Sequence, residues 1–167
     1  EANRMAAALQ KLSLERDASD WVRAGQVELA EKLGGDLDPK QAAQIALDVL
    51  AERLSAVTAA LHLEAGDGAF ERTATFAFAP SEGATPSGQR FRPGEGLLGQ
   101  AALTPQIRVI HDVPAGYASA RSGLGEAPPS CLVFVPLRRG PTTIGVAELG
   151  LFRPCSDAAR DFLAAVA

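Results

Sequence analysis

The segment Gly94-Glu95-Gly96-Leu97-Leu98-Gly99-Gln100 leads, through His111-Asp112-Val113-Pro114, to the continuously apolar run Leu132-Val133-Phe134-Val135-Pro136-Leu137. Its glycines predict a loop that turns through Gly94 and Gly96 and then enters a short helix, in which Gly99 allows close packing. The apolar run is typical of a central strand that is buried on both faces. Together these stretches predict a unit that builds a pocket rather than a reaction centre.

The same glycines satisfy the pattern G-x-G-x-x-G of dinucleotide-binding folds. A dinucleotide site requires a buried strand before the glycines and an acidic residue about 20 positions beyond them. Here the polar stretch 80–90 and Pro93 precede the glycines, and Ser119 stands near the place of the acid. Because proline limits strand pairing, we interpret the glycines as a turn into a helix and not as a dinucleotide site.

The composition indicates one globular domain. The chain has 167 residues, of which 47% are hydrophobic and 22% charged, enough for one well-buried core but not for two. Its net charge is −4, and acidic and basic residues are interspersed, so there is no basic field to hold a phosphate backbone. The sequence has no run of about 18 apolar residues. We therefore expect no nucleic-acid partner and no direct membrane contact.

The two cysteines and two histidines predict neither a metal site nor a disulfide framework. Cys131 and Cys155 lack the C-x-x-C spacing of zinc sites, and His62 lies far in sequence from His111. We predict no metal, no cofactor and no catalytic residue, and we interpret Cys131 as a small buried hydrophobe. Cys155 comes just before a helix, a position that can activate a thiol, so a thiol enzyme stays open as an alternative. Free thiols fit a reducing cytosol, and we expect a cytoplasmic protein.

A long helical pattern opens the chain, from about residue 4 to residue 33. Its apolar positions recur at intervals of three and four in two stripes: Met5, Leu9 and Leu12, and then Leu14, Ala18, Val22, Gly25, Leu29 and Leu33. Helices with such seams pair, so we predict a homodimer through the terminal helices; the alternative is that the stripe covers the domain's own sheet. We divide the chain into a connector helix, 1–34, and a domain, 35–167. Because helical patterns run to both ends, we expect a module of a longer chain with an output domain after it.

Helix and strand signals follow one another through the domain. Asp38-Pro39-Lys40-Gln41 combines an N-cap acid, a first-turn proline and a capping-box glutamine, and so predicts the start of a helix. From Val57 the apolar period changes to two, which predicts a strand to Leu63, a turn at Gly66-Asp67-Gly68 and a returning strand over 70–78. The other predicted elements are a short helix over 97–103, strands over 107–110, 131–137 and 143–149, and a helix over 157–167 that Ser156 caps.

A long stretch that we predict to be irregular, 111–130, is rich in glycine, proline, serine and alanine. Loops of this length in compact domains are usually binding loops or disordered. Its polar side chains predict contacts to a small polar ligand in an otherwise apolar cavity; the alternative is a loop that satisfies its own polar groups. The predicted ligand-binding residues are Leu98, Val113, Tyr117, Arg121, Ser122, Leu124 and Glu126.

Four motifs in this order resemble the GAF domain family: GEGLLGQAALTPQIRVIHDVP, YASARSGLGEAPP, LVFVPL and IGVAELGLF. The resemblance runs from about Leu37 to the last residue and is greatest to GAF domains of bacterial sensor histidine kinases and chemoreceptors. It implies an α+β fold with a central antiparallel sheet of five or six strands. The N- and C-terminal helices would pack on one face, and pocket-forming loops and short helices on the other. It also implies a small-molecule pocket under residues 91–130 and a dimer through the terminal helices.

The chain departs from the GAF subfamilies whose ligands are best known. It lacks the Asn-Lys-Phe-Asp-Glu set of cyclic-nucleotide-binding domains, a cysteine in 115–130 that would hold a bilin, and a pocket-loop cysteine pair for methionine sulfoxide reduction. The resemblance therefore implies a non-catalytic sensory domain, cytoplasmic or in the cytoplasmic part of a membrane-anchored receptor, that binds an unidentified small molecule and transmits through its terminal helices. The alternative is a ligand-free dimerisation spacer whose pocket is filled by Leu98, Leu124 and Phe134.

Overall fold

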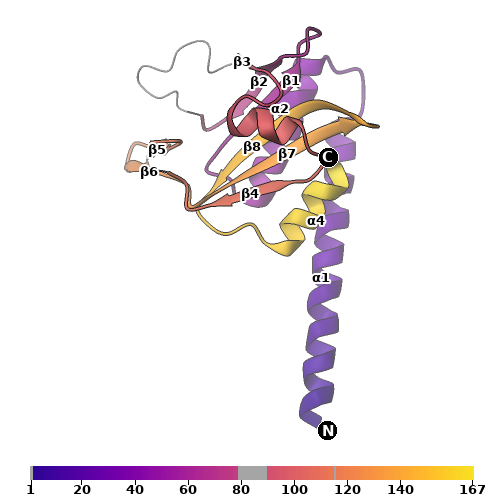
Figure 1. Cartoon of the computed structure of the whole chain (residues 1–167). Helices are drawn as coiled ribbons and strands as arrows, with labels where there is room; N and C mark the ends of the chain where they lie inside the picture. The colour runs from indigo at the N-terminus through magenta and orange to yellow at the C-terminus, as the bar shows by residue number, and fades with distance from the viewer. Residues whose placement is uncertain (1, 79–89, 115) are drawn as a thin grey trace.

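The computed structural model describes residues 2–78, 90–114 and 116–167, and Figure 1 shows how their helices and strands are arranged. Two helices come first, a set of strands with one short helix follows, and a last helix closes the chain. In chain order the elements are α1 (Ala2–Lys32), α2 (Pro39–Leu54), β1 (Thr58–Glu64), β2 (Phe70–Phe76), β3 (Arg90–Phe91), α3 (Gly96–Ala102), β4 (Arg108–His111), β5 (Ala120–Ser122), β6 (Gly125–Ala127), β7 (Cys131–Arg139), β8 (Thr142–Leu151) and α4 (Asp157–Val166).

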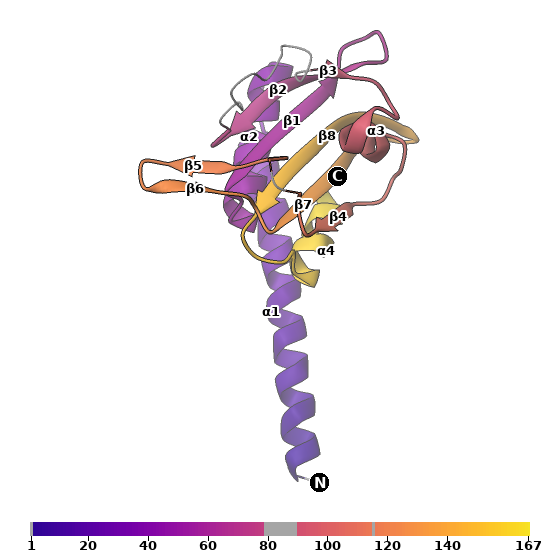
Figure 2. The ribbon, with the colours of Figure 1, turned by 60° about the vertical axis from the view of Figure 1, so that its left-hand side comes forward.

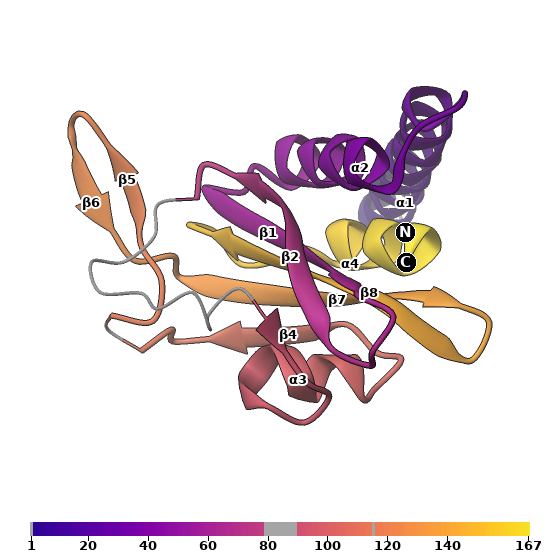
Figure 3. The ribbon, with the colours of Figure 1, turned by 90° about the horizontal axis from the view of Figure 1, so that it is seen from above.

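Six of these strands form one antiparallel sheet in the order β3-β2-β1-β8-β7-β4, and β5 and β6 pair separately. Seen from above, α1, α2 and α4 lie on one side of the sheet and α3 lies on the other (Figure 3). The predicted α+β fold, with both terminal helices on one face, is therefore confirmed, and the main sheet has six strands.

Local sequence explains where α2 begins. Asp38 Oδ1 accepts a hydrogen bond from the Gln41 backbone N–H at 2.8 Å, and Gln41 Oε1 accepts one from the Asp38 backbone N–H at 3.1 Å. This reciprocal pair satisfies donors that the first turn of a helix leaves free. Pro39 occupies the first turn, where its missing N–H costs nothing. The predicted helix start is confirmed.

The sheet carries an apolar layer on each face. The larger layer lies on the side of α1, α2 and α4 and includes the fully buried Leu47, Leu61, Val133, Leu149 and Phe162. The smaller layer lies on the side of α3 and includes Phe70, Phe91, Leu132, Phe134 and Val146, with Leu97 and Leu98 of α3 packed against it. Neighbouring residues of β7 point alternately into the two layers, so the predicted burial of this strand on both faces is confirmed.

Helix α1 contacts the rest of the domain through its second half. Gly25 is its one buried residue among those described. The four large apolar residues of its first half are between 61% and 69% exposed: Met5, Leu9, Leu12 and Leu14. Figure 1 shows this half extending away from the sheet. The predicted stripe from Leu14 to Leu33 is therefore divided. Leu14 is exposed with the first half of the helix, whereas later positions such as Val22 pack against the domain.

Two predicted elements differ from the structure. The strand predicted over 70–78 ends at Phe76, because Ala77 takes a left-handed φ of 46° that breaks the extended backbone. The stretch 111–130 is not wholly irregular, since β5 and β6 form a hairpin that projects beyond the sheet (Figure 2). Its strands have three residues each, too few and too polar for an apolar alternation to reveal them in the sequence.

Candidate functional site

Strand β8 presents a carboxyl group on the sheet face opposite the terminal helices. Glu148 lies opposite Ala60 of β1 and Phe134 of β7. Directly paired residues share a face of the sheet, and Phe134 belongs to the apolar layer on the α3 side. Glu148 therefore faces the α3 side, whereas Ala147 and Leu149, its neighbours in sequence, pack in the layer under the helices.

Tyr117, from the loop between β4 and β5, is the polar partner of this carboxyl group. Burial raises the pKa of Glu148 to about 7, and a hydrogen bond from the Tyr117 hydroxyl offsets part of that rise. Burial and the nearby Glu148 charge raise the pKa of Tyr117 above its ordinary value, so the phenol keeps its proton and donates. Among the described residues, no basic side chain forms an ion pair with Glu148.

Beside the half-buried Glu148, His62 of β1 is a fully buried polar group on the same face. It is 2% exposed, and its ring meets the Phe91 ring edge-on at a centroid distance of 5.3 Å. Burial and the Arg72 charge lower the pKa of His62 to about 4, although the Val146 carbonyl accepts a hydrogen bond from the ring. The ring is therefore neutral near pH 7. Its Nδ1 atom is buried without a hydrogen-bond partner in the described part of the chain.

The predicted ligand-binding residues fall into two groups. Leu98 and Val113 pack in the layer on the α3 side, and Tyr117 contacts Glu148. The other four belong to the β5–β6 hairpin, away from the sheet (Figure 2). There Arg121 and Glu126 form an ion pair at 2.8 Å, Ser122 Oγ accepts a hydrogen bond from the Leu124 N–H, and the Leu124 side chain is wholly exposed. A role for these four in binding stays a prediction.

Two polar residues of this face, Glu148 and His62, were not among the predicted site residues. Glu148 had a usable signal, because it is the one charged residue in the otherwise apolar or small run Ile144–Phe152. A charge within a strand that is apolar on both sides has to be exposed, paired or functional. His62 had a weaker signal, because the alternation along β1 places it on the face opposite Leu61 and Leu63 but does not show whether that face is covered.

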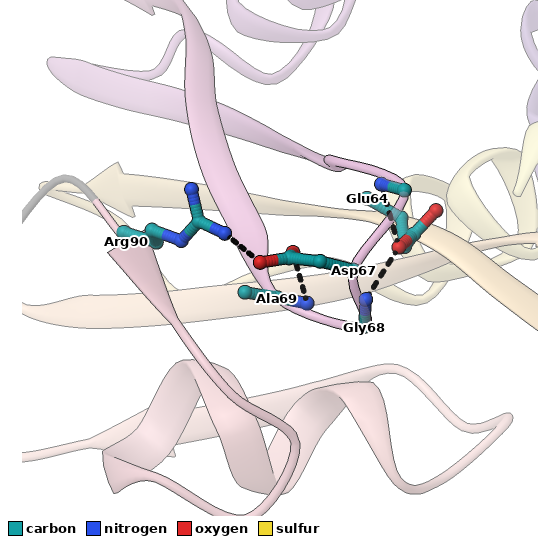
Figure 4. Close-up of polar contacts among 6 residues, drawn as sticks. Glu64, Asp67, Gly68, Ala69 and Arg90 are labelled. Atoms are coloured by element: carbon teal, nitrogen blue, oxygen red, sulfur yellow. Dashed lines mark hydrogen bonds and ion pairs between the residues drawn. The ribbon is translucent and has the colours of Figure 1, made fainter.

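A separate groove of about 490 Å³ lies at the end of the sheet where the β1–β2 and β7–β8 turns are, between the end of α3 and the β7–β8 turn. Thr104 Oγ1 and Arg138 Nε, from two residues of its wall, are buried without a hydrogen-bond partner in the described ranges. The β1–β2 turn forms its other wall. Figure 4 shows how that turn is held: Glu64 accepts hydrogen bonds from the backbone N–H groups of Gly66 and Gly68, and Asp67 accepts one from the Ala69 N–H and forms an ion pair with Arg90 of β3. Both carboxylates of the turn therefore stabilise its conformation.

The two thiols lie away from the Glu148 face. Cys131 and Cys155 are free, buried, and part of the layer under the helices. Burial raises the pKa of both thiols, which opposes the activation that a helix N-terminus offers Cys155. The described residues contain no group of three metal-ligating side chains. Within the same ranges, every helix is too short or too polar to cross a membrane.

Solved structures with a similar fold include two GAF domains and a reductase. The GAF domain of a phosphoenolpyruvate-protein phosphotransferase from Coxiella burnetii is 20% identical, with 89% of this chain and 90% of that chain covered and a TM-score of 0.63. The GAF domain of a putative sensor histidine kinase from Pseudomonas syringae pv. tomato is 14% identical, with 95% and 85% covered and a TM-score of 0.55. The free methionine-R-sulfoxide reductase from Neisseria meningitidis is 17% identical, with 89% and 84% covered and a TM-score of 0.65.

These identities show a shared fold and no more. A search of curated proteins found no match. The family model described as GAF domain matches residues 36–167. On the fold and on this match, the chain belongs to the GAF domain family.

Proposed function

We propose that this chain is a non-catalytic sensory domain of a bacterial signal-transduction protein, such as a sensor histidine kinase or chemoreceptor, that works in the cytoplasm. A small molecule binds on the α3 side of the sheet, and α1 and α4 carry the effect to an output domain in the same longer chain. One observation carries the proposal: Glu148 and Tyr117 meet on one face of β8, while the other face of that strand packs under the terminal helices.

The path from the site to the helices is short. Ala147 and Leu149 flank Glu148 in sequence, point to the opposite face, and pack in the same apolar layer as Phe162 of α4. Because a packed core responds to a displaced strand by shifting its neighbours, a ligand that moves β8 at Glu148 also displaces the side chains on which α4 rests.

Arg53 of α2 joins α1 to α4. Its Nη2 donates a hydrogen bond to the Trp21 carbonyl at 2.5 Å, and its Nη1 pairs with Glu28 at 3.0 Å. The guanidinium lies 4.6 Å from the centre of the Trp21 ring and 5.3 Å from that of Phe162, and these two rings meet edge-on at 5.6 Å. The two terminal helices therefore share one polar and aromatic junction.

The mechanism is a shift between two arrangements of this junction. A ligand changes their populations only by the difference between its affinities for the two arrangements, so a preference of a few kcal/mol is sufficient to change the output. We propose that the exposed apolar residues of the first half of α1 pair with a second copy, which would convert a change at the junction into a change in helix pairing.

The placement of the thiols supports a non-catalytic role. Cys131 and Cys155 are buried on the helix side, away from Glu148 and Tyr117. A thiol enzyme needs an accessible thiolate beside its substrate. A ligand on the α3 side would therefore be separated from both sulfur atoms by the sheet itself.

A thermal-shift screen against a library of small metabolites tests the proposal, followed by amide hydrogen exchange with each compound that raises Tm. We expect at least one compound to stabilise the chain, to do so less in Tyr117→Phe, and to alter exchange over residues 21–32 and 157–166. Glu71→Gln, at an exposed position of β2, is the matched control. A bound compound that leaves exchange in both helices unchanged would contradict the proposed transmission.

The second candidate is a ligand-free dimerisation spacer. It is favoured by the exposed apolar stripe of α1 and by the packing of Leu98 and Phe134 in the layer on the α3 side. Leu124, the third residue expected to fill the pocket, is wholly exposed and fills nothing. A stable dimer that no compound of the library stabilises would support the spacer.

A further inference from the structure

Glu148 has no cationic partner in the part of the chain that the structure describes. All 16 lysine and arginine side chains and both histidines belong to the described residues. None of them forms an ion pair with Glu148. The residues directly opposite it, Ala60 and Phe134, have no polar side-chain atoms.

A carboxylate in this position is costly unless something compensates its charge. Glu148 is half-buried, and charges that are removed from water in proteins are normally paired, because their desolvation is unfavourable. A carboxylate has about four lone-pair sites, and the Tyr117 hydroxyl occupies one of them. The described residues place no second side-chain donor on this carboxylate, so acceptor sites remain on it for the donors of a ligand.

His62 places a second unsatisfied polar atom nearby. In the β1–β8 register Ala60 is opposite Glu148, so His62, two residues further along β1, is its diagonal neighbour on the same face. Diagonal neighbours are about 7–8 Å apart. The His62 ring is neutral and 2% exposed, and Nδ1 has no partner among the described residues. A neutral imidazole does not repel a cation.

We propose that Glu148 is the recognition carboxylate for a small organic cation, a ligand with a primary ammonium group that donates to Glu148 and a hydrogen-bonding group within reach of His62. This inference rests on the proposed function, because it names the chemical class of ligand for the same face of the sheet. An anionic ligand would place like charges together, and an uncharged one would leave the half-buried carboxylate without a counter-charge.

Three four-carbon probes of similar size and different charge test the proposal: n-butylammonium, n-butanol and n-butyrate. The titrations are followed by the amide NMR signals of Ala60, Phe134 and Glu148 in the whole chain at pH 8. At this pH Glu148, whose pKa is about 7, is ionised, and an alkylammonium group, with a pKa near that of lysine at about 10.4, is charged. We expect n-butylammonium to bind at least tenfold more tightly than either of the other probes.

Variants separate charge from shape. Glu148→Gln should weaken n-butylammonium binding at least tenfold, Glu148→Asp should keep the preference for the ammonium probe, and Glu71→Gln should bind as the native chain does. Lowering the pH to 5.5 should also weaken binding at least tenfold, because Glu148 takes up a proton. The melting temperature of each variant, measured beside the titration, shows that it is folded.

Two results would overturn the inference. If all three probes shift these signals equally and Glu148→Gln has no effect, the face binds small molecules without regard to charge, and the proposed sensory function survives alone. If no probe shifts them, the ammonium site is wrong, and the thermal-shift screen then decides the proposed function independently.

Discussion

Gly25 of α1 packs against Arg53 of α2 so closely that a Cβ atom at position 25 would lie 2.5 Å from Arg53 Nε. The same atom would lie 2.6 Å from a ring carbon of Phe162. Real Cβ atoms do not make contacts this short, so a larger residue at position 25 would require Arg53 and the buried Phe162 ring to shift. Gly25 thus sets the spacing of the junction that Arg53 and Trp21 complete.

Gly25→Ala should therefore open the junction. Alanine favours a helix over glycine by about 1 kcal/mol, but overpacking a filled core costs about 1–3 kcal/mol. We expect a net loss of stability in denaturant unfolding and faster hydrogen exchange over residues 21–32. Ala24→Ser, which adds one atom at the exposed neighbouring position, should change stability by less than about 0.5 kcal/mol. An alanine variant more stable than the native chain would show that the contact is relieved without cost.

Arg53→Lys should loosen the same junction while keeping the positive charge. Lysine cannot bond the Trp21 carbonyl and Glu28 with a planar fork, nor lie over both aromatic rings as arginine does. Loss of hydrogen bonds to a charged group costs about 1.5–3 kcal/mol. We expect a lower melting temperature and loss of exchange protection in the second half of α1, with β7 and β8 little changed. Equal protection in the two proteins would mean that apolar packing alone holds α1.

Glu148 should make the stability depend on pH in an unusual direction. Its pKa rises from 4.5 to about 7 on folding, so the folded chain binds more protons than the unfolded chain between these values, and stability falls as pH rises. At about 1.4 kcal/mol per pKa unit, the native chain should lose about 3 kcal/mol relative to Glu148→Gln between pH 4.5 and pH 8.

His62 acts in the opposite sense over part of this range. Its pKa falls from 6.5 to about 4 on folding, so its contribution to stability is lost as the pH falls from 6.5 to 4. The profile of the native chain is the sum of the two effects, and only the difference between native and Glu148→Gln isolates the carboxyl group. Urea unfolding of both proteins from pH 4.5 to pH 8 measures it. Parallel profiles would mean that Glu148 is ionised at all these values and solvated or paired.

The cysteines should react slowly in the folded chain. Cys131 and Cys155 are 1% and 6% exposed, and burial raises the pKa of both thiols. A disulfide reagent at pH 8 should label them at least a hundredfold more slowly in native buffer than in denaturant. Rapid labelling of Cys155 alone would revive the thiol-enzyme alternative.

Much of the fold was predictable from local signals. The capping box at Asp38, the change to a period of two at Val57, and the continuous apolar run that became β7 each report on residues close together in sequence. Such signals reflect hydrogen bonds within one turn or the burial of one strand, and these do not depend on the rest of the chain.

The site was less predictable, because it depends on which face of the sheet the helices cover. Polar residues clustered in sequence at Arg121–Glu126 predicted binding, and this stays a prediction; the structure shows that Arg121 and Glu126 pair with each other across a hairpin. Glu148 stands alone among apolar and small residues, and its meaning emerges only when the register places it on the face opposite the helices. The exposure of the first half of α1 likewise depends on how far the rest of the domain extends along the helix, and the apolar pattern of α1 does not contain that information.

Native mass spectrometry of the purified chain and of Glu148→Gln tests whether a small molecule binds at Glu148, because it detects a bound molecule by its mass without knowledge of its identity. Spectra are taken as purified and after incubation with the metabolite library. We expect an added small-molecule mass on the native chain that is absent or much weaker on Glu148→Gln. A native chain that carries no added mass under any of these conditions, or a variant that retains it unchanged, would contradict the claim that Glu148 marks a sensory binding site.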